Sequence, residues 1–405
     1  MPAVWDFAVI GGGASGMAAA IAAAQSGDHV LLLEKSPALG RKIAASGNGR
    51  CNLMNSGEAV YYGDSDFAAE VFRRIRKEDL IRFWNEAGLF LAEEDQGRMY
   101  PMTFQSATVL DALKTLLNMY HTEIKLQTNV LGVRREEGLF AIDSSAGSFR
   151  TRRVLVAVGG AAYPRLGGTE DGYRIMESLG HTIIPPFPAL CPLCTDRISI
   201  SGLSGIRVRC GILLLGKDRK LLYRTNGEVL FTDYGISGIC AMQCARFVNG
   251  QECSLHIDLT GDLFSDREKM IDTLRKRRKR FERFSPEHIL NGILVPKLSF
   301  AVLKQAGITL RGRTAGSLTD EEISRTAETL RDYSLRITET RGFTEAQVSA
   351  GGVDCAAFDP STMESSIVPG LYAAGEVLNV DGDCGGFNLM FATATGLLAG
   401  KNGRN

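Results

Sequence analysis

The sequence predicts an α/β protein whose main domain is built from both ends of the chain, with a smaller β-rich insertion between them. Strand-like apolar runs alternate with helical segments up to about residue 190. Short strand-like runs broken by glycine, asparagine or charge dominate residues 190–259, which is typical of a small antiparallel sheet or barrel. Glycine-rich turns and an apolar strand return from about residue 347, so we expect this piece to fold back onto the N-terminal domain.

Length and composition limit the function classes. The chain has 405 residues, enough for two or three domains. Its 46 basic and 46 acidic residues give a formal net charge of zero, which argues against bulk electrostatic binding of nucleic acid or an anionic membrane. No apolar run is long enough to span a bilayer. The nine scattered cysteines favour reduced thiols and therefore a cytoplasmic location. The first strand-like run begins almost at Met1, so we expect no cleaved signal peptide. No second pair with metal-ligand spacing follows the cysteines at residues 191–194, so we expect no metal site.

The N-terminal segment carries the clearest motif. An apolar run at residues 7–10 enters a turn in which Gly11, Gly13 and Gly16 have G-x-G-x-x-G spacing. The first glycine permits a tight turn, the second lets a pyrophosphate approach the backbone, and the third lets the following helix lie close to the strand. The helix N-terminus offers free N–H groups and partial positive charge to the phosphates. The motif therefore predicts a dinucleotide site.

An acidic residue narrows the choice of dinucleotide. The second apolar run, at residues 30–33, ends in Glu34, whose carboxylate can accept hydrogen bonds from an adenosine ribose and would repel a 2′-phosphate. The ligand is therefore FAD or NAD. Three further segments favour FAD: a strand ending in paired glycines at 154–160, a strand ending in Gly-Glu at 370–378, and a glycine-rich turn opening a helix at 382–398. The last could aim N–H groups at a flavin ring.

Several longer runs resemble a known family. They are GGGASGMAAA (11–20), GRKIAASGNGRCNLMN (40–55), GRMYP (97–101), VGGAAYPRLGGTEDGY (158–173) and the segment 349–396. The chain resembles the aminoacetone-oxidase-like family of FAD-dependent bacterial oxidoreductases, which includes flavoproteins proposed to reduce bile-acid enones. The resemblance implies a Rossmann-like two-dinucleotide-binding FAD domain that contains an inserted β-barrel-like domain and a small helical domain.

The resemblance also implies domain boundaries and site residues. The FAD domain would comprise residues 1–189 and 341–405, the β-barrel-like domain residues 190–260 and 318–340, and the helical domain residues 261–317. The residues expected to bind FAD non-covalently are Gly11, Gly13, Ala14, Ser15, Gly16, Glu34, Lys35, Arg41, Lys42, Ser46, Gly47, Gly49, Arg50, Cys51, Asn52, Val130, Gly159, Gly160, Gly375, Glu376, Gly386, Phe387, Asn388 and Leu389. Candidate catalytic residues are Arg50, Tyr100 and Tyr163, on loops that the resemblance places near the flavin ring.

The electron donor and the substrate stay open. We find no second G-x-G-x-x-G between residues 190 and 333, so NAD(P)H would bind only transiently. We favour a reductase that passes hydride from NAD(P)H through FAD to an activated C=C bond of a hydrophobic small molecule such as a steroid-like enone. The alternatives are an amine oxidase of the aminoacetone type that uses O₂, and a non-enzymatic flavin-bearing adaptor. The oligomeric state is not predicted.

Three other features have ordinary structural interpretations. Residues 275–280 read RKRRKR, but Ile271, Leu274, Phe281 and Phe284 are spaced to give the same helix an apolar face, so a solvated helix face is favoured over a nucleic-acid patch. The thiol of Cys51, and the C-x-x-C pair at residues 191–194, are expected to be structural.

Overall fold

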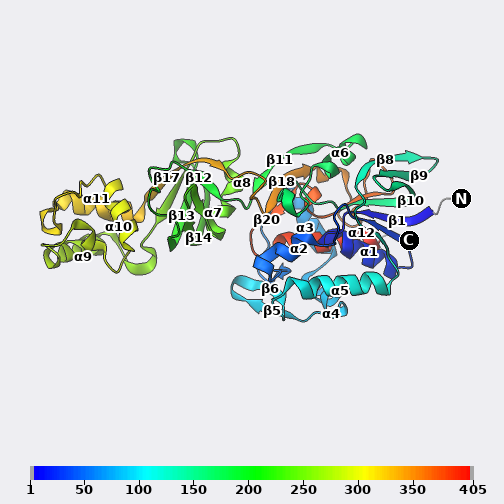
Figure 1. Ribbon diagram of the computed structural model, residues 1–405, viewed down its shortest axis with the longest axis horizontal. Helices are drawn as coiled ribbons and strands as arrows, with labels where there is room; N and C mark the ends of the chain where they lie inside the picture. Colours follow the sequence, from blue (N-terminus) through cyan, green and yellow to red (C-terminus); the bar gives the residue numbers. More distant parts are fainter. Residues whose placement is uncertain (1–3, 402–405) are drawn as a thin grey trace. The chain divides into compact units, whose positions relative to one another are not determined.

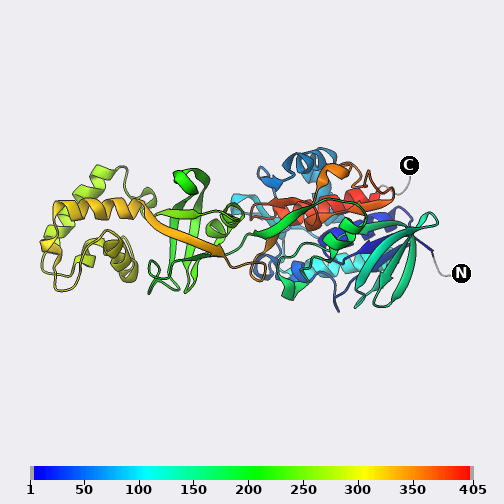
Figure 2. The same ribbon diagram turned by 90° about the horizontal axis from the view of Figure 1, so that it is seen from above.

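The computed structural model describes residues 4–401 and divides the chain into two compact units. The first unit is Met1–Ala189 with Phe343–Asn405, and the second is Leu190–Gly342. In Figure 2 the blue N-terminal and red C-terminal segments belong to the same unit. The C-terminal piece therefore folds back onto the N-terminal part, as the sequence predicted.

A seven-stranded mixed sheet forms the centre of the first unit (Figure 1). Its parallel part has the order β7 (Glu123–Lys125), β2 (Val30–Leu33), β1 (Val4–Ile10), β10 (Gly147–Val156) and β19 (Leu371–Ala373). Strands β9 (Leu139–Ser144) and β8 (Val130–Glu136) extend the sheet from β10 in antiparallel pairing. All four residues of β2 are buried, as expected of a parallel strand covered on both faces.

Two helices of the first unit, one from each end of the chain, pack at backbone distance. They are α1 (Ala14–Gln25) and α12 (Phe387–Lys401). A Cβ added at Gly396 would lie 2.2 Å from the Ser15 carbonyl oxygen, and one added at Gly400 would lie 2.3 Å from the Ala19 carbonyl oxygen. Only glycine permits this approach, so small residues on both helices determine the packing.

The other elements of the first unit surround this core. Helix α5 (Ser106–Met119) contacts α1. Residues 65–86 form two helices, α3 (Ser65–Arg74) and α4 (Lys77–Glu86), which are separated where the backbone of Ile75 and Arg76 is extended. Short sheets join distant segments: β3 (Met54–Asn55) with β6 (Arg98–Pro101) and β5 (Leu91–Glu94), β20 (Val380–Gly382) with β4 (Tyr61–Gly63), and β11 (Ile183–Ala189) with β18 (Val348–Val353). Helices α2 (Arg41–Ala45) and α6 (Asp171–Ser178) also belong to this unit.

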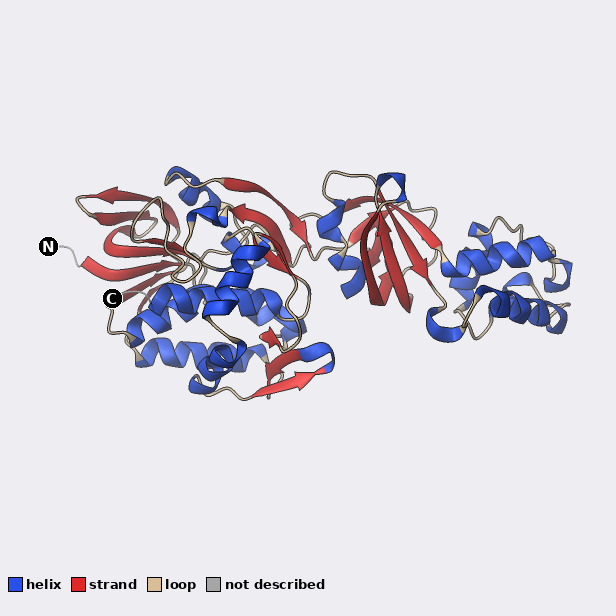
Figure 3. Cartoon of the chain, turned by 180° about the vertical axis from the view of Figure 1, so that it is seen from behind, coloured by secondary structure: helices blue, strands red, loops and turns tan. Residues whose placement is uncertain are grey.

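The second unit contains a closed antiparallel barrel (Figure 3). Its strand order is β12 (Leu193–Thr195), β15 (Gly235–Ser237), β14 (Leu221–Phe231), β13 (Arg207–Leu215), β16 (Cys253–Asp258) and β17 (Tyr333–Thr340). Some of the short strand-like runs predicted within residues 190–259 join into two long strands, β13 and β14, because Gly211 and Asn226 pair with each other inside the ladder. The glycine does not end the strand, which is common where strands bend in a barrel.

Five helices also belong to the second unit. They are α7 (Ile239–Gln243), α8 (Ala245–Val248), α9 (Arg267–Arg280), α10 (Pro296–Gln305) and α11 (Asp320–Arg331). A capping box of Thr319 and Glu322 begins α11. At the start of α9 the cap is Asp266, whose side chain accepts the Lys269 N–H. Helix α11 packs against α9 and α10.

The predicted fold class is confirmed: a Rossmann-type domain with a mixed sheet, plus a six-stranded antiparallel barrel. The individual domain boundaries at residues 260, 317 and 340 stay predictions. Across residues 4–401, none of the helices combines the length and the apolar character needed to cross a bilayer.

Candidate functional site

The glycines of the N-terminal turn have different surroundings. Gly11 has φ +108°, and a Cβ there would lie 2.4 Å from the Ala157 carbonyl oxygen. A Cβ at Gly16 would lie 1.9 Å from the Gly11 carbonyl oxygen. A Cβ at Gly13 would meet no protein atom within 4 Å. The first and third glycines are thus required by the protein's own packing, whereas Gly13 opens onto space at the N-terminus of α1, where a pyrophosphate would fit.

The Glu34 carboxylate is held beside this turn. Its Oε2 accepts the Gly12 N–H at 2.8 Å, and its Oε1 accepts the Ser36 N–H at 2.7 Å. The Glu34 carbonyl oxygen also accepts the Thr128 N–H, two residues before Val130, the first residue of β8. The carboxylate is therefore fixed at the place where a ribose attached to the pyrophosphate would need an acceptor.

A second carboxylate lies at the ends of β10 and β19. Glu376 Oε2 pairs with Lys42 Nζ at 2.9 Å, and Oε1 accepts the Ser349 N–H at 2.9 Å. A Cβ added at Gly159 would lie 3.7 Å from Glu376 Oε2 and 3.8 Å from Lys42 Nζ. A Cβ added at Gly160 would lie 2.7 Å from Ser349 Oγ, so this glycine is required for packing. The structure thus brings together four predicted cofactor residues.

The loop after α2 has an unusual backbone. Gly47 and Gly49 have positive φ, and so do two non-glycine residues, Asn48 (φ 56°) and Cys51 (φ 59°). The Cys51 N–H donates to the Ser46 carbonyl oxygen at 3.1 Å and closes the loop. Such conformations cost about 1–3 kcal/mol each and concentrate at functional sites. The strain therefore supports a functional reading of this loop.

Cys51 itself fits an inert thiol. Its side chain is buried, and burial raises its pKa to about 11, partly offset by a hydrogen bond with Ser46. The thiol is therefore protonated at neutral pH, and a protonated thiol is a poor nucleophile.

The end of the loop meets the turn before α12. A Cβ added at Gly386 would lie 2.4 Å from the Met54 carbonyl oxygen and 2.7 Å from Asn52 Oδ1. Asn55 Nδ2 donates to the Gly385 carbonyl oxygen at 2.9 Å. Asn52 Oδ1 is buried and has no hydrogen-bond partner within residues 4–401. A buried acceptor is normally paired, so a ligand with an N–H group would suit this position.

The first residues of α12 hold the turn together. Asn388 uses both ends of its amide on Gly382, accepting from the N–H and donating to the carbonyl oxygen, each at 2.8 Å. The Tyr61 hydroxyl donates to the Phe387 carbonyl oxygen at 3.0 Å. Leu389 is half-buried. Asn388 therefore shapes the turn before α12.

Two of the three catalytic candidates lie together. The Arg50 guanidinium carbon is 4.3 Å from the Tyr100 ring centroid and 4.6 Å from that of Phe104, and Arg50 Nη2 pairs with Glu94 at 2.6 Å. The Tyr100 ring also borders Gly47 of the strained loop. Burial raises the pKa of Tyr100 above its ordinary value, although the charge of Arg50 opposes the shift.

The remaining predicted residues make contacts within the protein. Tyr163 has φ 55° and donates its N–H to the Phe343 carbonyl oxygen, and no contact described within residues 4–401 joins it to Arg50 or Tyr100. Two of the predicted cations bind other residues: Lys35 pairs with Asp171 at 3.7 Å, and Arg41 donates to the Arg165 carbonyl oxygen at 2.7 Å. Ala14 is the first residue of α1. A Cβ added at Gly375 would lie 2.6 Å from Ser15 Oγ.

Sequence reasoning missed three polar residues of this region. Ser349 Oγ accepts the Ala162 N–H at 2.8 Å, Thr395 Oγ1 accepts the Gly375 N–H at 3.0 Å, and Asn55 holds Gly385. No local signal marks them, because each acts on a segment far away in the sequence. The G-x-x-x-G spacing of Gly396 and Gly400, opposite an alanine-rich helix, is a signal that could have predicted the α1–α12 contact.

These features fit a dinucleotide that carries a flavin. Gly11 and Gly16 would shape the turn, and Gly13 with the start of α1 would hold the pyrophosphate. Glu34 would bind the adenosine ribose, and the 46–52 loop with the turn before α12 would bind the ring end. The open space at Gly13 and the unpaired Asn52 Oδ1 are the observations that support this fit.

Comparison with known proteins identifies similar chains. The family model described as HI0933-like protein Rossmann domain matches residues 5–402. A 3-dehydro-bile acid delta(4,6)-reductase of Clostridium scindens is 35% identical, with 97% of each chain covered. A ribosomal RNA dihydrouridine synthase of Haemophilus influenzae is 30% identical, covering 95% of this chain and 94% of that protein. Its Escherichia coli counterpart is 28% identical, covering 96% and 95%.

Proposed function

The chain belongs to the HI0933-like Rossmann family, which agrees with the predicted class of FAD-dependent oxidoreductase, and we propose that it reduces a C=C bond conjugated to a carbonyl group with NAD(P)H as electron donor. The names of its relatives support this chemistry. A 3-dehydro bile acid with Δ4,6 unsaturation is a conjugated ketone, and dihydrouridine is uridine whose C5=C6 bond, conjugated to a carbonyl, has been saturated. Two kinds of substrate thus share one reacting group.

The observation that carries the proposal is the cradle formed by the N-terminal turn and Glu34. Gly13 leaves space where the protein has no atom of its own, and the carboxylate beside it is held by two backbone N–H groups. FAD, when bound, supplies hydride chemistry that side chains lack. The chain's own part is to bind and orient it, and to deliver a proton.

Tyr100 is our candidate for that proton delivery. Saturating one C=C bond adds a hydride, which originates from NAD(P)H, and a proton, which must come from an acid. The Tyr100 hydroxyl is protonated at neutral pH, and burial raises its pKa further above the ordinary value of 10.0. Arg50, stacked on the Tyr100 ring and paired with Glu94, fixes the ring in place. The Tyr100 oxygen would be reprotonated from solvent after each turnover.

The first candidate substrate is a flat hydrophobic enone, as the sequence suggested. The bile-acid reductase, at 35% identity, supports this choice. An apolar molecule of this size binds largely through burial of its surface, at about 25 cal/mol per Å². A small-molecule substrate and a cytoplasmic location stay predictions.

The second candidate substrate is a uracil base in RNA. The observation that favours it is the concentration of positive charge in the second unit: residues 261–317 carry 13 lysines and arginines but six aspartates and glutamates. The dihydrouridine synthases supply the corresponding chemistry. RNA, with one phosphate per nucleotide, presents far more negative charge to such a region than a steroid-like molecule does.

Anaerobic absorbance spectroscopy tests the proposal. We expect NADH or NADPH to bleach the bound flavin, and an enone or a uridine-containing RNA to restore its colour. Bleaching by aminoacetone, with peroxide formed in air and no response to NAD(P)H, would establish the amine-oxidase alternative instead. No response to any of these compounds would favour the flavin-bearing adaptor.

A Tyr100→Phe variant tests the proton donor. We expect bleaching by NAD(P)H at the normal rate but recovery by the unsaturated substrate slowed by about 100-fold. In the unsubstituted protein the recovery rate should stay constant through neutral pH and fall only above the ordinary tyrosine pKa of 10.0, because the raised pKa keeps the hydroxyl protonated below it. An unchanged recovery rate in the variant would exclude Tyr100.

A further inference from the structure

Helix α9 of the second unit carries six consecutive cationic residues, at positions 275–280. The zero net charge of the whole chain conceals this cluster, because residues 261–317 have seven more basic than acidic residues while the rest of the chain has the opposite excess. The expectation of no nucleic-acid partner was based on that total. Electrostatic recognition depends on local charge, so the surface of α9 requires separate consideration.

On one side of α9, the arginines bind residues of the same unit. Arg275 and Arg278 both pair with Asp320 at the start of α11, at 3.5 Å and 2.9 Å. Arg278 also donates to the Leu318 carbonyl oxygen at 2.9 Å. These two arginines therefore attach α9 to α11 and are not available to a partner.

On the other side of α9, the cations are exposed to solvent. Lys276, Lys279 and Arg280 are exposed. Lys279 and Arg280 form no ion pair with any residue in the described part of the chain, and Lys276 pairs only with Asp272, on the preceding turn of the same helix. Because an exposed pair of this kind contributes little, all three charges are free to meet an anionic partner.

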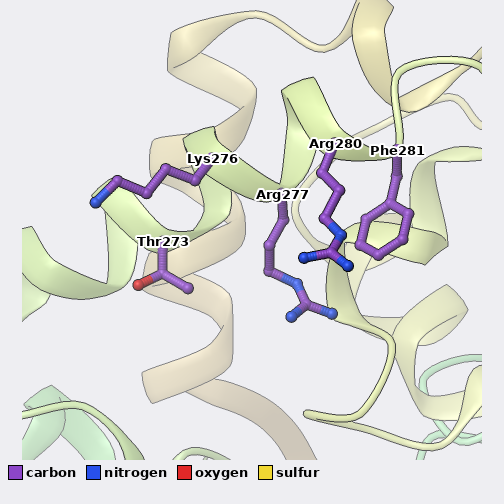
Figure 4. A pocket seen from close by; sticks show the side chains of 5 residues that line it. All are labelled: Thr273, Lys276, Arg277, Arg280 and Phe281. Carbon is purple, nitrogen blue, oxygen red and sulfur yellow. The ribbon is translucent and has the colours of Figure 1, made fainter.

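A surface hollow lies along this side. Its lining residues are Thr273, Lys276, Arg277, Arg280 and Phe281, which follow one another at helical spacing (Figure 4). Arg277 donates from Nε to the Ile289 carbonyl oxygen at 2.6 Å, so its position is fixed. The guanidinium carbons of Arg277 and Arg280 lie 5.5 Å and 6.0 Å from the Phe281 ring centroid. Arg277 is therefore held in place, and the Phe281 ring lies within cation–π distance of both arginines.

An exposed aromatic residue continues the surface beyond the helix end. Phe284 is 54% exposed, although the sequence suggested that it would belong to an apolar helix face. Its ring centroid is 5.1 Å from that of His288, which limits its freedom. The buried apolar residues of α9 are Met270 and Leu274. The Phe281 ring links Phe284 to the cations, because its centroid lies 6.2 Å from that of Phe284 and 6.0 Å from the Arg280 guanidinium carbon. Exposed aromatic rings near cations are the arrangement with which proteins bind single-stranded nucleic acid.

We propose that this surface, formed by Lys276, Lys279, Arg280 and Phe284, binds RNA. The three cations contact phosphates, and the Phe284 ring stacks on a base. A membrane is disfavoured because Met270 and Leu274 are already buried, and an acidic peptide would leave the exposed ring unused. The proposal rests on the second candidate function, whose substrate is a base in RNA, but RNA binding is measured without any turnover.

Fluorescence anisotropy of a labelled, single-stranded RNA of about 20 nucleotides tests the proposal with the purified, flavin-loaded protein. We expect the triple variant Lys276→Ala, Lys279→Ala, Arg280→Ala to bind at least about tenfold more weakly near 50 mM salt. Removing three phosphate contacts should also reduce the slope of log K against log salt by about 2. Phe284→Ala should weaken binding while leaving that slope unchanged.

A matched control removes the same charge elsewhere in the unit. Lys297, Lys304 and Arg311 are exposed and lie on other elements, so their triple alanine variant should retain most of the affinity. Flavin content and the circular dichroism spectrum establish that each variant is folded. Equal losses in both triple variants would overturn the proposal, as would no RNA binding at low salt or equal competition by polyglutamate. If RNA binds as expected but uridine does not restore flavin colour, the candidate reaction fails and the binding surface stands.

Discussion

The turns that open α1 and α12 look alike in sequence but differ in what their glycines do. Gly13, before α1, would tolerate a Cβ without meeting any protein atom within 4 Å. Gly386, before α12, has φ +103°, and its Cβ would lie 2.4 Å from the Met54 carbonyl oxygen. The first turn leaves space for a bound ligand, whereas the space at the second turn is filled by the 46–52 loop and by the strand that follows this loop. The comparison separates a ligand-binding glycine from a packing glycine.

Gly386→Ala should have the largest effect on folding. The added Cβ meets backbone at Met54, in a conformation that L side chains rarely adopt, so we expect the free energy of unfolding of the flavin-free protein to fall by about 3 kcal/mol. Urea denaturation measures this. Gly132→Ala is the matched control, because Gly132 lies in β8 with no atom within 4 Å of its added Cβ. An unaffected Gly386→Ala protein would show that this turn is not tightly packed.

Glu34→Ala should have an intermediate effect that involves both folding and binding. It leaves the N–H groups of Gly12 and Ser36 without their acceptor, at a cost of about 2 kcal/mol, and it removes the ribose acceptor. We expect lower stability without FAD and weaker FAD binding, measured by denaturation and by titration. Glu34→Gln, which retains one acceptor oxygen, should recover part of both. Full FAD affinity in Glu34→Ala would place the ribose elsewhere.

Lys42→Ala should have the smallest effect on stability, about 1 kcal/mol. The Lys42–Glu376 pair is only partly exposed, at 29% and 20%, so breaking it leaves a half-buried carboxylate without its cation. Arg73→Ala is the control, because it breaks the more exposed pair with Glu70 and removes the same charge. If the two variants unfold at the same urea concentration, the Lys42 pair has no special role.

The first turn could be predicted because its chemistry is local. The glycine spacing, the apolar strands and Glu34 lie within one short segment, and the structure places them together. The sequence shows that the turn before α12 is rich in glycine. It does not show why residue 386 must be glycine, because its neighbours Asn52 and Met54 are more than 300 residues away. The role of Ser349 and Thr395, and the exposure of Phe284, likewise depend on contacts between distant segments. Local patterns predict local geometry, whereas packing across the chain must be observed.

The FAD content and stability of Gly13→Ala test the central claim most directly. Because Gly13 has φ −84°, an alanine there is unstrained, and its Cβ would occupy only the space assigned to the pyrophosphate. We predict that the purified variant unfolds at the same urea concentration as the flavin-free parent, but binds FAD at least about tenfold more weakly, a change of about 1.4 kcal/mol. Undiminished FAD binding by a stably folded Gly13→Ala protein would contradict the account.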